Sequence, residues 1–364
     1  MLWPDAPDRP VEVGQCHDIS SEICTTDRGD AGGLGFIGAG NDVSQLAAEL
    51  DRTRQLLHDV GPTHGDTIPV GVGLLLWGLE VGQVTSIIAD PTRRPAAVWL
   101  FAPRQMSDLS AWSEGIRDAT DCSTKIWIQI GTAAEAVAAL EYARPDVLVV
   151  QSQDAGGHGL TKGAGLIPLL PEVIAAVEQA AASRGQSCPS FIAAGGIMDG
   201  TCAAAALALG AHGVCLGTKL LATPEANLAD GYRQAVIRAK DGGVSTVRSH
   251  VYDTLRGTTS WPDRYGGRGV INASYWDFEE GMDMEHNKSL YNKALEQGDE
   301  GWDENRGRLT TYAGTGVGLV TRLQPAAEIV AEMRADSMVV LQRTTERMKS
   351  FCIDWPAEQA AGSR

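Results

Sequence analysis

The sequence predicts an α/β fold, a (β/α)8 TIM barrel with a helical insertion after its last strand, from three observations. Short apolar runs alternate with amphipathic stretches rich in Ala, Leu and Glu between residues 34 and 216. The runs are nearly continuous in apolar residues, which is typical of parallel strands that helices cover. Glycine-rich turns follow the last three runs, at the end of the strands where such barrels bind their ligands.

Seven runs are candidate barrel strands. They span residues 34–39, 68–76, 97–102, 125–130, 147–152, 191–194 and 213–216. Helical patterns accompany them at residues 43–60, 107–119, 133–143, 166–182 and 202–209. A closed barrel of this class needs eight strands, so the first strand is atypical or missing. Only residues 11–14 offer a weak strand before Gly33.

The chain divides into five segments. They are an atypical N-terminal segment (1–30), the barrel (31–229), an insertion or lid (230–310), a barrel-closing segment with a helix over 325–343 (311–350), and a tail (351–364). The insertion is polar, rich in glycine and studded with Trp and Tyr, which predicts a small helical subdomain beside the barrel mouth. We expect its aromatic side chains to serve mainly in packing.

The composition argues against several classes of function. A formal net charge of -16 would repel a nucleic-acid backbone, so no nucleic-acid partner is expected. The seven cysteines form no C-x-x-C pair and have no histidine at ligand spacing, so we expect no metal site and a reducing compartment. We recognise no signal peptide and no membrane span, and we expect a cytoplasmic protein without a membrane partner. The sequence allows a homo-oligomer and leaves the oligomeric state open.

The first glycine cluster, Gly33-Leu-Gly35-Phe-Ile-Gly38, has the G-x-G-x-x-G spacing of a dinucleotide-binding fold. That fingerprint requires a strand before it and a helix that opens within it. Here a polar segment precedes the glycines, and the two apolar residues between them favour a buried strand. We therefore interpret this cluster as a glycine-rich barrel strand.

The second glycine cluster places a histidine at the end of a strand. The apolar run 147–152 leads into Asp154-Ala-Gly156-Gly157-His158-Gly159. Glycine lets the backbone approach a planar cofactor closely, and histidine binds an anion or moves a proton near neutral pH. A lone loop histidine is usually just solvated, but catalytic residues of barrels lie at the carboxyl ends of strands. His158 is therefore the candidate catalytic residue.

Two further glycine turns follow consecutive strands. Gly195 and Gly196 follow the run 191–194, and Gly217 and Thr218 follow the run 213–216. Paired turns after the last two strands expose backbone N–H groups and commonly bind phosphate. Thr218 adds a hydroxyl donor, and Lys219 is placed to add a charge. The alternative is that the glycines only allow tight packing between strand and helix.

Together these segments resemble the nitronate monooxygenase family, formerly grouped as 2-nitropropane dioxygenases, which are FMN-dependent barrels. The matching pieces are AGGLGFI at 31–37, DAGGHG at 154–159, AAGGIMDG at 193–200, GT at 217–218, LAT at 221–223 and YAGTGVGL at 312–319. The resemblance covers residues 31–332. The insertion motif TLRG at 254–257 is similar to the fungal type of the family. The chain lacks the Ala-Pro-Met turn that normally ends the first strand of the family.

The resemblance implies FMN as the cofactor. The residues that would contact it are Gln151, Gly156, Gly157, Gly195, Gly196, Cys215, Leu216, Gly217 and Thr218. Backbone groups of the two glycine turns would hold the phosphate, and His158 would lie over the isoalloxazine ring. The implied reaction oxidises an alkyl nitronate, or a nitroalkane, with O2 to a carbonyl compound and nitrite. His158 would orient the anionic nitronate and remove the α-proton of a neutral nitroalkane.

Two alternatives stay open. An FMN-dependent reductase or oxidase of a biosynthetic pathway would use the same fold and would be distinguished by flavin reduction with NAD(P)H. A degenerate barrel that has lost its first strand, and the flavin with it, would serve as a binding or inactive protein. The missing Ala-Pro-Met turn motivates this second alternative, although an absent strand would expose two sheet edges.

Cys215 lies within a predicted strand, and its thiol is therefore expected to be inert.

Overall fold

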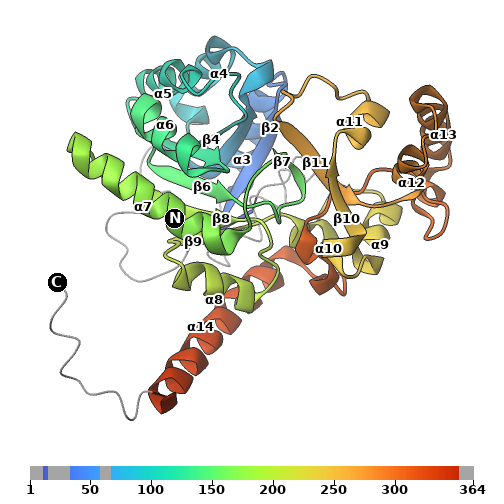
Figure 1. Cartoon of the computed structure of the whole chain (residues 1–364). Coiled ribbons are helices and arrows are strands. Elements are labelled where there is room, and N and C mark those ends of the chain that lie inside the picture. The colour runs from blue at the N-terminus through green and yellow to red at the C-terminus, as the bar shows by residue number, and fades with distance from the viewer. Residues whose placement is uncertain (1–10, 15–32, 58–66, 352–364) are drawn as a thin grey trace.

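The computed structural model describes residues 11–14, 33–57 and 67–351, and parallel strands close into a barrel at its centre (Figure 1). Around the barrel the order is β1-β2-β3-β4-β5-β6-β8-β9. Their bounds are β1 (Val11–Gly14), β2 (Gly33–Gly40), β3 (Ile68–Leu75), β4 (Pro95–Phe101), β5 (Lys125–Ile130), β6 (Val147–Gln151), β8 (Ser190–Ala194) and β9 (Gly213–Leu216). The predicted TIM barrel is confirmed.

The first strand is present and closes the barrel. Val13 lies opposite Leu34 of β2 on one side and opposite Cys215 of β9 on the other, both in parallel register. A strand with hydrogen-bonding neighbours on both edges needs little intrinsic propensity, which explains its weak signal in the sequence. The hypothesis of a barrel that has lost this strand is therefore wrong. The other residues of the predicted segments 1–30 and 351–364 lie almost entirely outside the described part.

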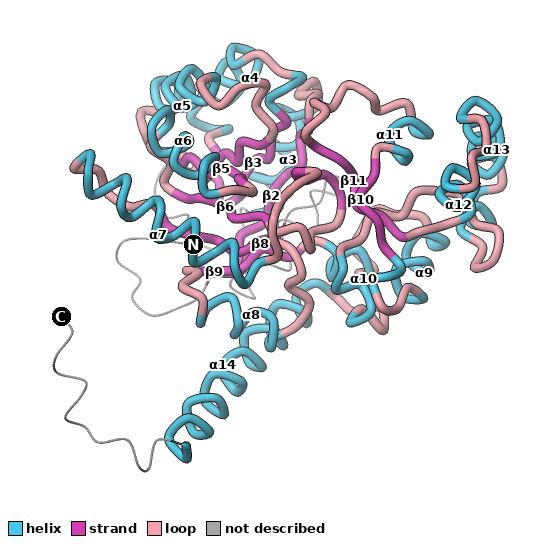
Figure 2. Tube along the Cα trace, viewed as in Figure 1, coloured by secondary structure: helices cyan, strands magenta, loops and turns pink. Residues whose placement is uncertain are grey.

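Helices cover the outside of the barrel (Figure 2). They are α3 (Leu46–Leu57), α4 (Val81–Ile88), α5 (Asp108–Ala119), α6 (Ala133–Ala143), α7 (Leu166–Arg184), α8 (Gly200–Ala208) and α14 (Ala326–Phe351). Short 3-10 helices lie at η1 (Leu76–Gly78), η2 (Pro91–Arg93), η3 (Thr218–Ala222), η4 (Gly298–Trp302) and η5 (Thr315–Leu319). Helix α4 was not predicted from the sequence, because its short stretch is rich in β-branched residues that favour strands.

From β2 onward, side chains along the barrel strands alternate between two apolar layers. Trp99, Trp127 and Val149 point to the interior of the barrel, whereas Val98 and Leu148 pack against the helices. The interior is therefore filled with bulky side chains and forms a packed floor, as in other barrels of this class.

Helix α7 has the length and apolar composition of a membrane-spanning helix. Its residues Leu170, Val173 and Val177 are fully buried in the layer between strands and helices. It sits in the chain between β6 and β8, where a barrel requires a covering helix. About 33% of this apolar stretch is buried in this way, which is consistent with a covering helix of the barrel.

The insertion is not purely helical, which corrects the prediction. It contains α9 (Asp230–Arg238), α10 (Gly242–Ser245), α11 (Val251–Arg256), α12 (Ala273–Glu279), α13 (Met284–Glu296) and the strands β10 (Thr246–Ser249) and β11 (Tyr265–Val270). These strands form an antiparallel sheet with β7 (Gly157–Leu160), in the order β10-β11-β7. His158 lies opposite Gly267, so the segment predicted as a loop is an edge strand. Glycine-rich strands with partners distant in sequence give little local signal.

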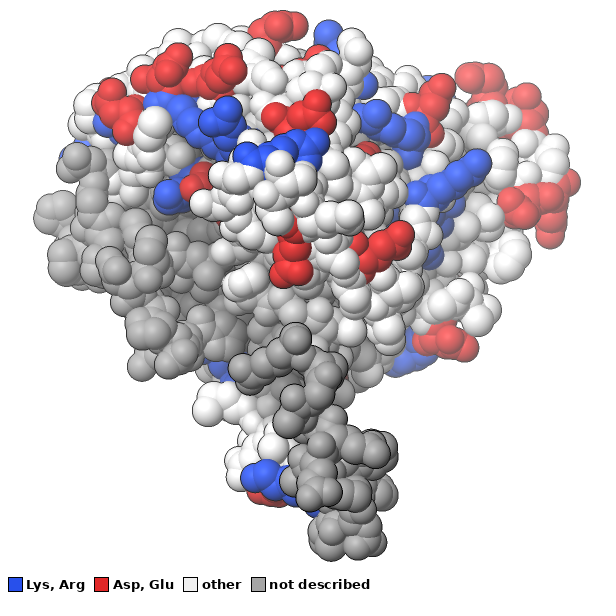
Figure 3. All heavy atoms as spheres, turned by 60° about the vertical axis from the view of Figure 1, so that its left-hand side comes forward, with Lys and Arg blue, Asp and Glu red and all other residues white. Residues whose placement is uncertain are grey.

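The surface mixes charges of both signs. On the face shown in Figure 3, acidic and basic side chains lie beside one another without a large basic patch.

Helix α14 begins near the predicted residue 325 but extends beyond the predicted end at residue 343 to Phe351. Its first half packs on the barrel through Ile329 and Met333, and its second half projects from the body in Figure 1.

Candidate functional site

A cavity of about 410 Å³ lies at the carboxyl ends of the barrel strands, next to the insertion. Its volume lies in the range of small-molecule and cofactor sites. The predicted residues that line it are Gln151, Gly156, Gly157, His158, Gly195, Gly196, Cys215, Gly217 and Thr218. The structure therefore brings residues from β6, β7 and the turns after β8 and β9 to one place.

Two predicted residues do not line this cavity. The side chain of Leu216 is 1% exposed and packs between strands and helices, because side chains alternate along β9 and Cys215 takes the inward position. Lys219 is half-buried near Glu332 and Asp199, and burial lowers the pKa of its ammonium group. The cavity end at Thr218 therefore lacks the lysine charge that the sequence suggested.

One end of the cavity is formed by the turns after β8 and β9. Gly195 and Gly196 have φ angles of +95° and +76°, which glycine adopts without strain. A Cβ atom on Gly195 would lie 2.7 Å from Ser152 Oγ and 2.9 Å from the Ala155 nitrogen. Thr218 Oγ1 accepts a hydrogen bond of 3.0 Å from the Gly314 N–H, which leaves the hydroxyl proton for an acceptor in the cavity. This end combines side-chain-free backbone with a hydroxyl donor, as an anion site requires.

Arg248 of β10 holds the loop that precedes His158. Its guanidinium donates to the carbonyl oxygens of Ala155 at 2.7 Å, Gly157 at 2.9 Å and Gly266 at 2.6 Å. Burial lowers the pKa of Arg248 to about 9, so the group remains charged at neutral pH. Asp154 partly offsets this effect, and Arg268 adds to it. The insertion therefore fixes the backbone of the second glycine cluster through a buried arginine.

His158 is held on three sides by other residues. Its Nε2 lies 2.8 Å from Asp253 Oδ1 of α11, and the two side chains are 13% and 4% exposed. Trp261 stacks on the imidazole with 3.9 Å between ring centroids and 2° between the planes. Tyr312 meets it edge-on at 5.5 Å. His158 is therefore not a solvated loop histidine, and its orientation is defined.

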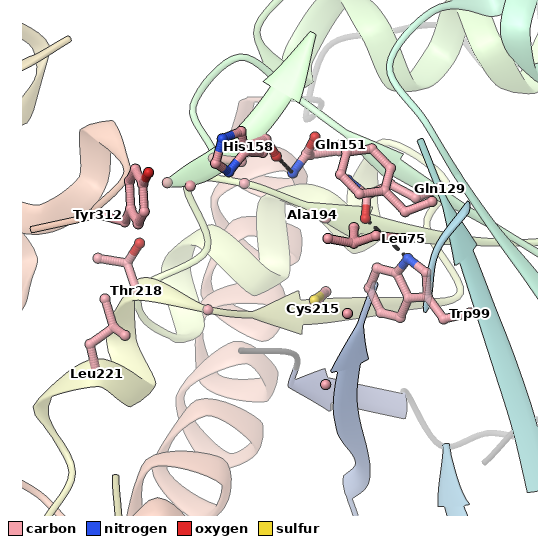
Figure 4. Close-up of a pocket in the computed structure, with 18 of the residues that line it drawn as sticks. Leu75, Trp99, Gln129, Gln151, His158, Ala194, Cys215, Thr218, Leu221 and Tyr312 are labelled. Carbon is pink, nitrogen blue, oxygen red and sulfur yellow. Dashed lines mark hydrogen bonds between the residues drawn. The ribbon is translucent and has the colours of Figure 1, made fainter. Parts of the chain in front are cut away.

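The other end of the cavity is formed by polar and aromatic groups above the barrel floor. Figure 4 shows Trp99 and Gln129 at this end, with Thr218 and Tyr312 at the opposite end. Trp99 Nε1 donates to Gln129 Oε1 at 3.0 Å. Gln151 Nε2 donates to the backbone oxygen of His158 at 3.1 Å, which links β6 to β7. A planar ligand that spans the mouth would therefore lie between the glycine turns and this floor.

Sequence reasoning missed Asp253, Trp261 and Arg248. Asp253 directly precedes the insertion motif at 254–257, and that proximity was an available but weak signal. Trp261 belongs to the aromatic set that was predicted to serve mainly in packing, yet it lines the cavity. Other members of that set, such as Tyr265, are buried in the apolar core as predicted.

Comparisons with known proteins agree on the family. The family model for nitronate monooxygenase matches residues 113–336. A nitronate monooxygenase of Metarhizium robertsii is 42% identical over 85% of this chain and 86% of its own length, and one of Neurospora crassa is 36% identical over 92% and 91%.

Among solved structures, a nitroalkane oxidase from Streptomyces ansochromogenes aligns with a TM-score of 0.66 at 22% identity, over 93% of this chain and 97% of its own. FabK from Thermotoga maritima aligns equally well at 21% identity, over 94% and 95%. At this level of identity both likenesses show the barrel fold alone. The match of the family model and the two sequence relatives show that the chain belongs to the nitronate monooxygenase family, a family of oxidoreductases.

Proposed function

We propose that this protein binds FMN and oxidises alkyl nitronates with O2 to a carbonyl compound and nitrite. The proposal rests on one cavity. Two glycine turns suited to binding phosphate lie at one end of it, and a buried, oriented histidine lies on its wall. Membership of the nitronate monooxygenase family supports the same chemistry, since relatives that match most of the chain carry that name.

The residues at the cavity fit a flavin nucleotide. The turn of Gly195 and Gly196 and the turn of Gly217 and Thr218 would hold the phosphate through backbone N–H groups and the Thr218 hydroxyl. Gly157, Gln151 and Cys215 line the space toward the barrel floor, where the ring system would lie. Bound FMN would supply the redox chemistry that takes an electron from the nitronate.

His158 would act on the substrate. Its position on the cavity wall lets it orient an anionic nitronate when protonated, and accept the α-proton of a neutral nitroalkane when neutral. Trp261, Phe101 and Leu75 contribute apolar surface to the same cavity, which suits the alkyl part of the substrate and excludes water.

The first test is a visible absorption spectrum of the purified protein, followed by mass identification of any cofactor that heat denaturation releases. We expect the bands of an oxidised flavin and the release of FMN. Oxygen uptake with an alkyl nitronate should then be measured for the wild type and for His158→Asn. We expect kcat/KM to fall by about 100-fold in the variant, because asparagine cannot supply the positive charge that orients the nitronate.

Two results would count against the proposal. A colourless protein that also fails to bind added FMN would refute the role of the cavity as a flavin site. A flavoprotein that is reduced by NAD(P)H but oxidises no nitronate would indicate a reductase instead. The cytoplasmic location, the segment boundaries and the lack of nucleic-acid or membrane partners stay predictions.

A further inference from the structure

We propose that Asp253 is the positioning residue that makes His158 a base: it fixes which imidazole nitrogen carries the proton and stabilises the imidazolium that proton abstraction creates. This inference rests on the proposed function, because the proton comes from a neutral nitroalkane. It assigns a role in acid-base chemistry to the insertion, in addition to its covering the cavity and holding the loop before His158.

The contact between the two side chains is short and enclosed. Asp253 Oδ1 lies 2.8 Å from His158 Nε2, and the carboxylate is 4% exposed. The histidine comes from β7 and the aspartate from α11, 95 residues further along the chain. Pairing of β7 with β11 fixes the histidine backbone, so the two side chains approach from two separately supported elements.

This contact determines the tautomer of His158. A carboxylate only accepts hydrogen bonds, so the neutral imidazole must carry its proton on Nε2 and donate it to Asp253. The lone pair then resides on Nδ1, the ring nitrogen that remains for a molecule in the cavity. Without the carboxylate the two tautomers would compete, and the one with Nδ1 protonated has no base to offer there.

The surroundings hold the carboxylate in place. Asp253 Oδ1 also accepts from Thr258 Oγ1 at 3.1 Å and from the Tyr312 hydroxyl at 3.3 Å. Asp253 Oδ2 is buried and receives no hydrogen bond from the described residues. Arg256 of α11 is a further charged group near this cluster, and its guanidinium lies 5.3 Å from the centre of the Tyr312 ring. A buried carboxylate supported in this way stabilises a positive charge on its neighbour.

Trp261 also holds His158 in its orientation. Its indole stacks flat on the imidazole, which prevents rotation of the ring and covers one face from water. The face of an indole also attracts a cation. The stacked indole therefore fixes the plane of the imidazole and can accommodate the positive charge that proton abstraction places on the ring.

Abstraction of the α-proton needs no reactant other than His158 and the nitroalkane. His158 Nδ1 takes the α-proton as the C–H bond of the nitroalkane breaks, and the electron pair of that bond forms the C=N bond of the nitronate. The negative charge moves to the nitro oxygens, and the imidazolium remains paired with Asp253. The proton leaves to solvent after turnover. A substrate supplied as the nitronate has already lost this proton and does not need the step.

The test compares two forms of one substrate in the FMN-loaded enzyme. For Asp253→Asn we expect kcat/KM with the neutral nitroalkane to fall by about 100-fold or more, because the amide keeps the shape but not the charge. With the preformed nitronate we expect a clearly smaller loss, of about tenfold or less, because proton abstraction is not needed and only the orientation of the anion by the imidazolium is weakened. Asp253→Glu should restore part of the nitroalkane activity. An α-deuterated nitroalkane should react more slowly, with a larger isotope effect in the Asn variant.

Two controls separate this role from a structural one. Asp277→Asn removes another insertion carboxylate, which pairs with Arg308 away from the cavity, and should leave the ratio of the two activities unchanged. Nitrogen-15 NMR of histidine-labelled protein, with His158 assigned from the His158→Asn spectrum, reports the tautomer directly. We expect the Nε2–H form in the wild type and a mixture in Asp253→Asn, with or without flavin.

The possible results test the positioning role of Asp253 and the proposed function separately. Equal losses on nitroalkane and nitronate in Asp253→Asn would overturn the positioning role, as would a wild type that oxidises nitronates but no nitroalkane. An Nδ1–H tautomer in the wild type would overturn it even if the Asn variant fails to fold. A flavin-loaded wild type that oxidises no nitronate would refute the proposed function instead, while the NMR result would still test the tautomer.

Discussion

Gly195→Ala tests whether the turn after β8 depends on the absence of a side chain. At φ +95° an alanine is strained by about 1–2 kcal/mol. Its Cβ atom would also lie 2.7 Å from Ser152 Oγ and 2.9 Å from the Ala155 nitrogen, closer than carbon approaches either atom. Because one of these neighbours is backbone, relief requires a shift of the loop before His158, at about 1–3 kcal/mol. The expected loss in the free energy of unfolding is about 2–5 kcal/mol.

Gly185→Ala provides the matched control. Gly185 ends α7 at φ +61° and ψ +31°, and a Cβ atom there would meet nothing within 4 Å. This variant carries only the backbone term, about 1 kcal/mol. Urea unfolding of both variants without cofactor, and titration with FMN, would measure stability and affinity separately. Equal unfolding free energies for the two variants would refute the steric argument, and unchanged FMN affinity in Gly195→Ala would refute the place of this turn in the phosphate site.

Two further predictions concern single buried groups. Thr218→Val removes the acceptor of the Gly314 N–H, so we expect a loss of about 1–3 kcal/mol in urea unfolding and about tenfold weaker FMN binding in a fluorescence titration. Glu135→Gln should stabilise the protein at pH 7 by about 1 kcal/mol, because burial raises the pKa of the Glu135 carboxyl above 4.5 and so penalises its charged form. As the pH falls, the Glu135 carboxyl takes up its proton and the wild type regains the stability that burial of the charged form costs it. The difference in stability between the variant and the wild type should therefore vanish at pH 4 in thermal unfolding scans. An advantage of the Gln variant that is equal at both pH values would contradict this account.

The barrel half of the site could be predicted from the sequence, because its signals are local. Gly195, Gly196, Gly217 and Thr218 each follow a recognisable strand, and the carboxyl ends of parallel strands must meet at one end of a barrel. Leu216 is not among the residues that line the cavity, because side chains alternate along β9 and Cys215 takes the inward position. The first strand was uncertain because residues 11–14 gain their order from neighbours on both sides rather than from their own propensity.

His158 could be predicted from its place after a strand, but its partner Asp253 could not, because the signals that bring the two side chains together are distributed over the chain. His158 and Asp253 approach each other only after β7 has paired with β11, and that pairing depends on glycine-rich segments with little propensity of their own. Arg248 likewise acts on the loop at Ala155 from across the same small sheet.

The barrel and the insertion supply different parts of the site. The barrel supplies the groups suited to holding a phosphate, whereas the insertion supplies those that orient His158 and cover it, namely Asp253 and Trp261. The two halves meet at Gly157, which lines the cavity and whose carbonyl oxygen accepts a hydrogen bond from Arg248. Changes at Asp253 or Trp261 are therefore expected to alter proton transfer and substrate preference before they alter flavin binding, since the glycine turns suited to phosphate belong to the barrel.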